Sequence, residues 1–226
     1  MKKGEESLLV DLIDRGIKLI PSATSQLASR SKALQARLFG DLMVPQTIVV
    51  YDLHDLLEAI CLYQRQKNSK VVLKHDRKNG GLGIHLFRDI EDVYTQAANT
   101  VLTFPFVLQP FIGNASDIRV IIAGEYIEAY RRSNPDNFRN NLHWGGESSR
   151  WQLNDTQMEI CSEVMTRGSF PYGHIDLMTT EDKKNYLAEI NLNGGIKGAA
   201  ISAPELKERK RDVEEKLLNE LLMEAL

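Results

Sequence analysis

The sequence has few cysteines and no long apolar run. Cys61 and Cys161 are the only cysteines among 226 residues, too few for a disulfide framework and too far apart for a C-x-x-C motif. No apolar stretch approaches the ~20 residues that span a bilayer. The N-terminal segment MKKGEESLLV has acids directly after its lysines, where a secretory signal would have an apolar core. We therefore expect a cytoplasmic protein with no membrane partner.

Strong charge of one sign is also absent. The 28 basic and 31 acidic residues give a formal net charge of -3, so no overall field attracts the chain to nucleic acid. A hydrophobic content of 42% and a charged content of 26% are typical of a soluble globular protein. We expect one or two domains and no nucleic-acid partner.

Two common catalytic motifs are missing. The sequence contains no G-x-x-x-x-G-K-[ST] phosphate loop. It also contains no G-x-S-x-G nucleophile motif, and no Cys–His pair can be placed. These absences argue against a P-loop nucleotidase and against covalent catalysis by serine or cysteine.

The apolar spacing predicts helices alternating with antiparallel hairpins, an α+β outline. Helices are expected at residues 5–15, 25–40 (with Ser25 as N-cap), 52–66, 90–100, 155–167 and 204–226. Strands are expected at residues 17–20, 43–52 and 104–112, and hairpins at residues 71–87, 117–132 and 170–195. The mixed-sign run from Lys207 to Lys216 predicts a solvated helix face.

The last hairpin carries a cluster of oxygen-bearing side chains. If the hairpin turns between residues 182 and 183, Asp176 lies opposite Glu189 and His174 lies opposite Asn191. Alternation then places Asp176, Glu189 and Asn191 on one face of an otherwise apolar hairpin. Facing carboxylates repel unless a cation lies between them, and oxygen ligands of this kind suit Mg²⁺. The alternative is a solvated face with lysines nearby.

The stretch VVLKHDRKNGGLGIHLF predicts a second binding feature. Lys74 ends the first strand, and Gly80, Gly81 and Gly83 follow before the second strand begins. A lysine is a compact charge suited to phosphate oxygens, and glycines allow backbone N–H groups to close over a polyphosphate. By itself the glycine cluster is equally compatible with a flexible exposed loop.

Six blocks in order resemble the ATP-grasp ligases, and the ribosomal-protein glutamate ligase (RimK-like) branch most of all. They are SKALQARLF, VVLK…NGGLG, VLQPFI, DIRVIIAGEYIEAYRR, NFRNNLHWGG and IDLM…LAEINLNGG. The resemblance covers about residues 25–198. It implies an ATP-grasp fold, in which two α+β subdomains with antiparallel sheets hold ATP between them.

The resemblance also implies roles for individual residues. Lys32 and Lys74 match lysines that contact the ATP phosphates, and Gly80, Gly81 and Gly83 match the lid over them. The hinge segment that meets adenine corresponds to Gln109, Phe111 and Ile112, although Pro110 replaces an acidic residue and lacks the N–H of a backbone contact. Asp117 is expected on the nucleotide, Arg119, Arg132 and Asn141 are expected to be catalytic, and Asp176, Glu189 and Asn191 match the magnesium ligands.

The implied activity is ATP-dependent ligation of a carboxylate to an amine through an acyl phosphate, with Mg²⁺ or alternatively Mn²⁺. The carboxylate is expected on a small molecule, a peptide or a protein, and the amine on an amino acid. Two other functions stay open: a nucleotide-binding subunit without ligase activity, and a carboxylate kinase that stops at phosphorylation.

Members of the family usually carry a further α/β domain ahead of the SKALQ block. We interpret residues 1–24 as the last helix and strand of that domain, and residues 25–203 as the ATP-grasp domain. Within it, the lid subdomain is expected at about residues 45–107 and the C-terminal subdomain at about residues 108–203. Residues 204–226 form a C-terminal amphipathic helix. A homo-oligomer, or a partner subunit that supplies the missing domain, is expected.

Overall fold

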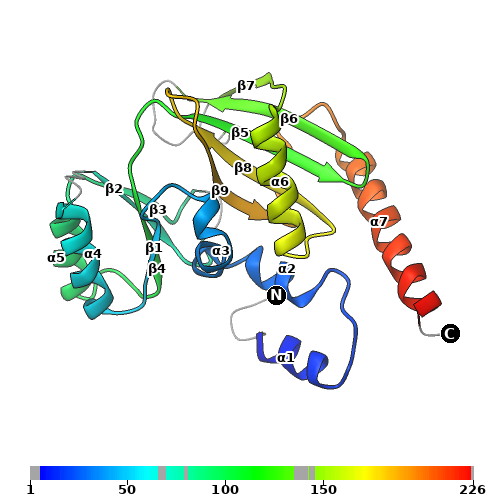
Figure 1. Ribbon diagram of the computed structural model, residues 1–226, viewed down its shortest axis with the longest axis horizontal. Helices are drawn as coiled ribbons and strands as arrows, with labels where there is room; N and C mark the ends of the chain where they lie inside the picture. The colour runs from blue at the N-terminus through cyan, green and yellow to red at the C-terminus, as the bar shows by residue number, and fades with distance from the viewer. Residues whose placement is uncertain (1–5, 66–69, 79–80, 135–141, 143–145, 225–226) are drawn as a thin grey trace.

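The computed structural model describes residues 6–65, 70–78, 81–134, 142 and 146–224, which form two antiparallel sheets with helices packed against them (Figure 1). The four-stranded sheet has the order β1-β4-β2-β3, and the five-stranded sheet has the order β7-β6-β5-β8-β9. Every strand pairing within them is antiparallel. The predicted α+β class is therefore confirmed.

The helices and strands follow most of the predicted pattern. The helices are α1 (Glu6–Asp14), α2 (Ala23–Ala28), α3 (Lys32–Phe39), the 3-10 helix η1 (Gly40–Leu42), α4 (Leu53–Arg65), α5 (Ile90–Ala98), α6 (Asp155–Arg167) and α7 (Ala203–Glu224). The strands are β1 (Ile48–Val50), β2 (Val71–His75), β3 (Ile84–Phe87), β4 (Phe106–Pro110), β5 (Ser116–Ala123), β6 (Tyr126–Ser133), β7 (Glu147–Arg150), β8 (Tyr172–Thr179) and β9 (Asn185–Asn191). The sequence does not predict β7, because its four residues are all polar and exposed. None of the helices in the described ranges has the length and apolar character needed to cross a membrane.

Helices α4 and α5 cover one face of the four-stranded sheet (Figure 1). On that face they bury alternate residues of two strands, namely Val71, Leu73, Phe106 and Leu108. Because strand side chains alternate, Lys74 and Gln109 lie on the opposite face, toward the five-stranded sheet. Since β4 ends at Pro110, the expected subdomain division near residue 107 falls inside this strand.

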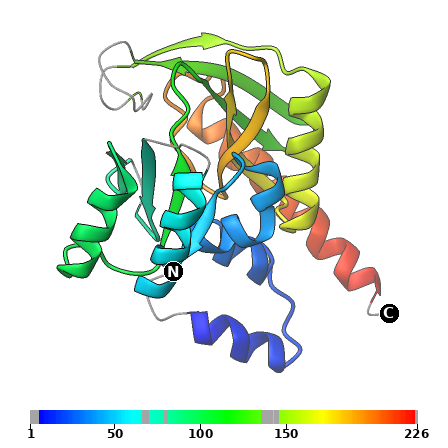
Figure 2. The same cartoon turned by 60° about the vertical axis from the view of Figure 1, so that its left-hand side comes forward.

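The five-stranded sheet has different cover on its two faces (Figures 1 and 2). α6 packs on the face that carries Ile175 and Leu177, which are fully buried in the core. On the opposite face, α7 packs against Tyr172 at one end of β8. The same face continues along β8 to Asp176 and across to Arg119 of β5. These polar residues lie past the region that α7 covers, and they face the four-stranded sheet.

The β8–β9 hairpin pairs its polar residues in the predicted register. Asp176 lies opposite Glu189, and His174 lies opposite Asn191. The register nearer the turn is different from the prediction, since Thr179 pairs with Asn185. The predicted turn centre between residues 182 and 183 is wrong: residues 181–183 form a three-residue loop centred on Asp182.

Two local features together restore the predicted register at the polar end. Lys183 has a positive φ of 62°, which closes the longer loop. The pairing then shifts by one residue between Asp176 and Leu177, so that Ala188 is an extra residue in β9. Leu187 and Ile190 therefore both point into the core although they are three residues apart. The bulge at Ala188 thus sets the face on which Glu189 lies.

Residues 22–40 form two helices where one was predicted. The side chain of Ser22 accepts a hydrogen bond from the N–H of Ser25 and caps α2, so the prediction of Ser25 as N-cap is wrong. Ser31 accepts from the N–H of Leu34 and caps α3. Serine side chains compete for backbone N–H groups in this way, which favours a new helix start over a continuous helix.

The N-terminal segment contains the predicted helix but not the predicted strand. α1 is present, whereas residues 17–20 form no strand, because no strand in the described part of the chain pairs with them. The apolar side chains of Leu8, Val10 and Ile13 are 55%, 53% and 51% exposed. The expected homo-oligomer or partner subunit stays a prediction.

We predict that Phe39→Ala lowers the free energy of unfolding by about 3–5 kcal/mol. Phe39 is fully buried, and it joins α3 to the core of the five-stranded sheet. Urea unfolding followed by circular dichroism measures the change. Leu57→Ala, at a side chain that is 48% exposed on α4, is the control. Equal, small losses in both variants would contradict the prediction.

Candidate active site

A cavity of about 470 Å³ lies between the two sheets. The four-stranded sheet contributes Val72, Lys74 and Gln109, and the five-stranded sheet contributes residues of β5, β6, β8 and β9. Residues 193–195, which follow β9, complete the wall. The cavity is therefore lined from both subdomains, and both polar and apolar side chains contribute to its wall.

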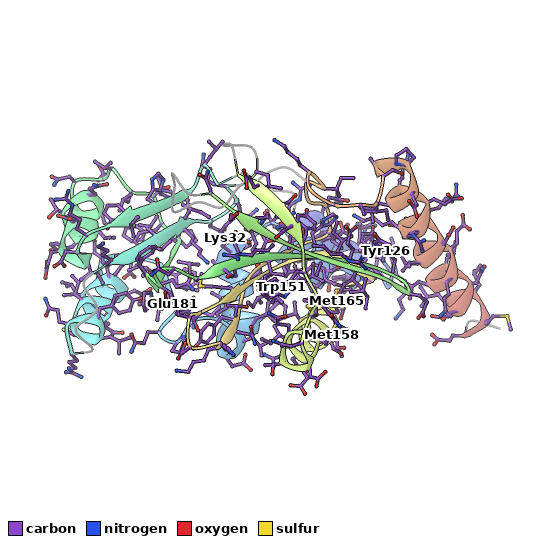
Figure 3. The ribbon with its side chains drawn as sticks, turned by 90° about the horizontal axis from the view of Figure 1, so that it is seen from above. Lys32, Tyr126, Trp151, Met158, Met165 and Glu181 are labelled. Atoms are coloured by element: carbon purple, nitrogen blue, oxygen red, sulfur yellow. The ribbon has the colours of Figure 1, made fainter. Side chains whose placement is uncertain are left out.

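Most of the predicted site residues line this one cavity. They are Lys74, Gly81, Gln109, Phe111, Ile112, Asp117, Arg119, Arg132, Asp176, Glu189 and Asn191. Lys32 lies where the two sheets meet (Figure 3) and reaches the cavity through a contact with Glu189. Gly83 lies in the loop between β2 and β3 and is not among the residues that line the cavity. Gly80 and Asn141 fall outside the described residues.

Two arginines and two aspartates form an ion-pair network on the floor of the cavity. Arg119 donates from Nε to Asp176 Oδ1 and from Nη2 to Asp176 Oδ2, the latter at 3.0 Å. Arg132 Nη2 lies 3.1 Å from Asp176 Oδ2, and its Nε donates to Asp117 Oδ1 at 3.1 Å. All four side chains are largely buried, with exposed fractions from 11% to 27%. Each carboxylate therefore has a cationic partner in a poorly solvated site.

The network shifts the pKa values of its carboxyl groups in opposite directions. Burial alone would raise the pKa of Asp176, but Arg119 and Arg132 outweigh burial and lower this pKa to about 2. Burial raises the pKa of Asp117, where Arg132 opposes the shift and the charge of Asp176 adds to it. Asp176 is thus a firmly ionised carboxylate at neutral pH.

Two lysines lie on the other side of the cavity, near Glu189. Lys32 Nζ lies 3.1 Å from Glu189 Oε1 and donates to the carbonyl oxygen of Lys78 at 2.7 Å. Lys74 Nζ donates to the carbonyl oxygen of Ala188 at 3.4 Å. Burial is the main cause that lowers the pKa of Lys74 to about 8; the charge of Lys32 acts in the same direction, whereas Glu189 opposes the shift. Lys74 is therefore a cation at neutral pH whose charge is easily removed.

The oxygen cluster fits a hard divalent ion by its chemistry. Asp176, Glu189 and Asn191 supply carboxylate and amide oxygens from two adjacent strands, and all three line the same cavity. The described part of the chain contains no group of three or more His, Cys, Asp and Glu side chains suited to a metal, so the amide of Asn191 is needed to complete a set of three. Arg119 and Lys32 now neutralise the two carboxylates, as a cation would.

The start of the glycine loop is fastened to the N-terminus of α3. Asp76 Oδ1 accepts hydrogen bonds from Ser31 Oγ at 2.9 Å and from the N–H of Ala33 at 3.1 Å. A carboxylate is favourable at this end of a helix, where N–H groups lack partners. Gly81 has a positive φ of 77° and lines the cavity, so this glycine suits the close approach of backbone to a ligand.

The hinge segment after β4 offers fewer amide donors than its position suggests. Pro110 pairs with Val71 at the end of β4 and has no N–H to donate. The N–H of Phe111 already donates to the carbonyl oxygen of Lys70 at 3.0 Å. Gln109 is buried and lines the cavity. A ligand here would meet carbonyl oxygens and side chains in place of these two amides.

Lys210 is a site-supporting residue that the sequence does not reveal. It lies in the charged run predicted to be a solvated helix face, yet its Nζ donates to Leu192 O at 2.6 Å and to Asn193 Oδ1 at 3.0 Å. It also lies 3.4 Å from Nε2 of His174, and burial, together with Lys210 and Arg119, lowers the pKa of His174 to about 3. No spacing rule gives the rotation of α7 on the sheet, so no sequence signal would have found this contact.

Comparison with known proteins identifies the family of this fold. A family model described as the RimK-like ATP-grasp domain matches residues 25–220. The two-sheet fold is thus that of an ATP-grasp protein. The chain belongs to the RimK-like ATP-grasp family, as its sequence motifs predicted.

The curated relatives are similar over part of their length. A probable alpha-L-glutamate ligase of Cellvibrio japonicus (strain Ueda107) is 26% identical over 186 residues, which are 78% of this chain and 59% of that protein. A glutathione synthetase of Brucella melitensis biotype 1 is 28% identical over 165 residues, 68% of this chain and 49% of that protein. The chain therefore spans less than two thirds of either relative.

Solved structures share the fold at low sequence identity. D-cycloserine synthetase DcsG has a TM-score of 0.68 and 15% identity, over 94% of this chain and 79% of that one. The macrocyclase MdnC from Microcystis aeruginosa MRC, bound with its precursor peptide MdnA, has a TM-score of 0.59 and 20% identity, over 97% and 73%. The ATP-grasp ligase PsnB, complexed with a phosphomimetic variant of its minimal precursor, Mg and ADP, has a TM-score of 0.62 and 15% identity, over 92% and 66%.

We predict that Asp176→Asn destabilises the ligand-free protein by about 3–5 kcal/mol, because it leaves two buried guanidinium groups short of one anion. Chemical unfolding in the presence of EDTA measures the loss. The control is Asp182→Asn, since Asp182 is 58% exposed and its ion pair with Lys184 is on the surface. An unfolding midpoint of Asp176→Asn equal to that of the control would contradict the buried network.

Proposed function

We propose that this protein is an ATP-dependent carboxylate–amine ligase that forms an amide bond through an acyl phosphate. One observation carries the proposal: a single cavity collects a lysine from one sheet, two arginines from the other, and an oxygen cluster on the β8–β9 hairpin. Family membership supports the same chemistry, because the relatives include a protein named as a probable glutamate ligase and proteins named as glutathione synthetases.

ATP would lie across the cavity, with its base at the hinge and its phosphates near the lysines. Lys74 and Lys32 approach from the side of the glycine loop and are placed for the phosphate oxygens. Backbone N–H groups near Gly81, together with Gly80 by resemblance, would close over the phosphates. Gln109, Phe111 and Ile112 would enclose the base at the end of β4.

Asp176, Glu189 and Asn191 would hold Mg²⁺, with Mn²⁺ as an alternative. When bound, the ion supplies positive charge against the phosphate oxygens. The solved PsnB complex contains Mg and ADP, which is compatible with this assignment. Asp117, which accepts from Arg132, would keep that guanidinium directed into the cavity from the nucleotide side.

The proposed reaction has two steps. A substrate carboxylate oxygen attacks the γ-phosphorus of ATP, the bond to the β-phosphate oxygen breaks, and ADP leaves. An amine nitrogen then attacks the acyl carbon, phosphate leaves, and the nitrogen loses a proton. Arg119 and Arg132 would stabilise the negative charge that develops on the transferred phosphoryl group and on the acyl phosphate. Asn141, by resemblance, would assist at the acyl phosphate.

The substrate carboxylate belongs to a small molecule, a peptide or a protein, and we propose that the amine is an amino acid. Two readings compete with this one, namely a nucleotide-binding subunit and a carboxylate kinase. The dependence of ADP release on the carboxylate and the amine distinguishes these three functions. A ligase releases ADP in a carboxylate- and amine-dependent manner and forms an amide product, a kinase needs the carboxylate alone, and a binding subunit releases none.

We predict that Glu189→Ala lowers Mg²⁺-dependent ADP release by about 100-fold or more, because one oxygen ligand and the partner of Lys32 are both lost. Glu181→Ala is the matched control: Glu181 lies in the turn of the same hairpin, where it accepts from Asn114. Near-normal turnover in Glu189→Ala would remove the oxygen cluster from the mechanism.

We predict that affinity for Mg-ADP falls as the pH rises above about 8. Lys74 is charged below its lowered pKa of about 8 and neutral above it, so its attraction for phosphate is lost with rising pH. Lys32, Glu189, Asp176 and Asp117 are the charged groups that face it. Calorimetric titration at several pH values measures the effect. Lys74→Met should bind weakly throughout and lose this dependence; an unchanged profile in the variant would assign the effect to another group.

A further inference from the structure

β9 is an edge strand of the five-stranded sheet, and within the described ranges no strand pairs with its outer backbone groups. Such an edge exposes unpaired N–H and C=O groups. The bulge at Ala188 interrupts the ladder with β8 directly beside Glu189. The segment that carries Glu189 and Asn191 therefore has weaker support from its own sheet than a central strand would have.

Gln35 of α3 supplies the missing support at Ile190. The N–H of Ile190 donates to Gln35 Oε1 at 3.0 Å, and Gln35 Nε2 donates to Ile190 O at 2.8 Å. This pair of bonds is the one that a neighbouring strand would make. Gln35 Nε2 also donates to Ala28 O at 2.7 Å, and the side chain is only 1% exposed. Its amide is thus fixed at both ends in a buried site.

Resting on the proposed function, we propose that Gln35 is a positioning residue for the metal site, which fixes β9 so that Glu189 and Asn191 present their oxygens to the cavity. Ile190 lies between these two residues, so the backbone that Gln35 holds is the backbone that orients both side chains. Groups that orient metal ligands typically change metal affinity by about 10- to 100-fold when they are removed.

Helix α3 carries both Gln35, which holds β9, and Lys32, the lysine proposed to bind phosphate. Lys32 precedes Gln35 by one helical turn, so both side chains lie on the same side of the helix. Lys32 contacts Glu189 at 3.1 Å while Gln35 holds Ile190, the next residue. A shift of α3 relative to β9 would therefore disturb the lysine and the metal ligands together.

Only a side chain with an adjacent donor and acceptor can bond to both the backbone N–H and the backbone C=O of Ile190. Methionine has nearly the same shape but leaves the buried N–H and C=O of Ile190 without partners. An ionised glutamate accepts from the N–H but places a carboxylate oxygen against Ile190 O. A protonated glutamate donates from its hydroxyl to that oxygen and accepts from the N–H, so it restores both bonds.

The experiment compares Gln35→Met and Gln35→Glu with a matched pair at Gln157. Gln157 is another fully buried glutamine, and it holds the opposite end of the β8–β9 hairpin by donating to Thr179 Oγ1 and Asn185 Oδ1. Gln157→Met and Gln157→Glu therefore remove comparable hydrogen bonds far from the proposed metal ligands. The measured quantity is the Mg²⁺ concentration at half-maximal binding of ADP, followed by calorimetry.

We expect Gln35→Met to raise that Mg²⁺ concentration by about 10- to 100-fold while binding still saturates. Gln157→Met should leave it at the wild-type value. Gln35→Glu should bind Mg²⁺ poorly at pH 8 and recover toward wild type as the pH falls and its carboxyl becomes protonated. Gln157→Glu should show no such recovery. If Gln35→Met fails to fold, the pH dependence of Gln35→Glu still decides the question.

Amide exchange in the ligand-free protein tests the contact itself. We expect the N–H of Ile190 to exchange about tenfold faster in Gln35→Met than in wild type, in keeping with the loss of one buried hydrogen bond. Unchanged exchange, or equal Mg²⁺ shifts in Gln35→Met and Gln157→Met, would overturn the proposed role of Gln35. Either result would leave the proposed ligase function standing. Absence of Mg²⁺-dependent ADP binding in the wild-type protein would overturn the proposed function, and the metal-site role of Gln35 with it.

Discussion

The ion-pair network of Arg119, Arg132, Asp117 and Asp176 is the interaction on which the site depends. Buried charges are costly unless each has a partner, and here every charge has one. The pairing keeps Asp176 ionised inside a cavity, where an isolated carboxyl group would tend to take up a proton. An ionised carboxylate in a poorly solvated cavity is a suitable ligand for a divalent cation.

The division of one sheet face between two covers explains where this network lies. α7 packs over Tyr172 at one end of β8, and the four-stranded sheet faces Asp176 at the other end. Lys210 marks the boundary, because it donates to Leu192 O just after β9. On this face, β8 is thus covered by a helix at one end and left open to a ligand at the other end.

The sequence predicted which residues line the cavity better than it predicted the chain path that brings them together. Alternation along β8 and β9 is a local property, so it identified the facing pair Asp176 and Glu189. The predicted position of the turn was wrong, and the extra residue at Ala188 compensated for the error in register. Neither the loop length nor the bulge leaves a clear signal in the composition. The contacts of Gln35 and Lys210 depend on how helices rotate against a distant strand, and no local pattern specifies that rotation.

If the chain binds a metal ion and a nucleotide as proposed, the charge balance of the cavity favours their binding together. The acidic side chains at the cavity are Asp117, Asp176 and Glu189, and the basic ones outnumber them: Arg30, Lys32, Lys74, Arg119, Arg132 and Lys197. The free cavity therefore has an excess of positive charge. A divalent ion alone would increase that excess and would compete with Lys32 and Arg119 for the same carboxylates. A nucleotide alone would bring its phosphates against Asp176 and Glu189. If both entered, the phosphates would draw Lys32 away from Glu189, and the ion would take the place of Lys32 beside that carboxylate.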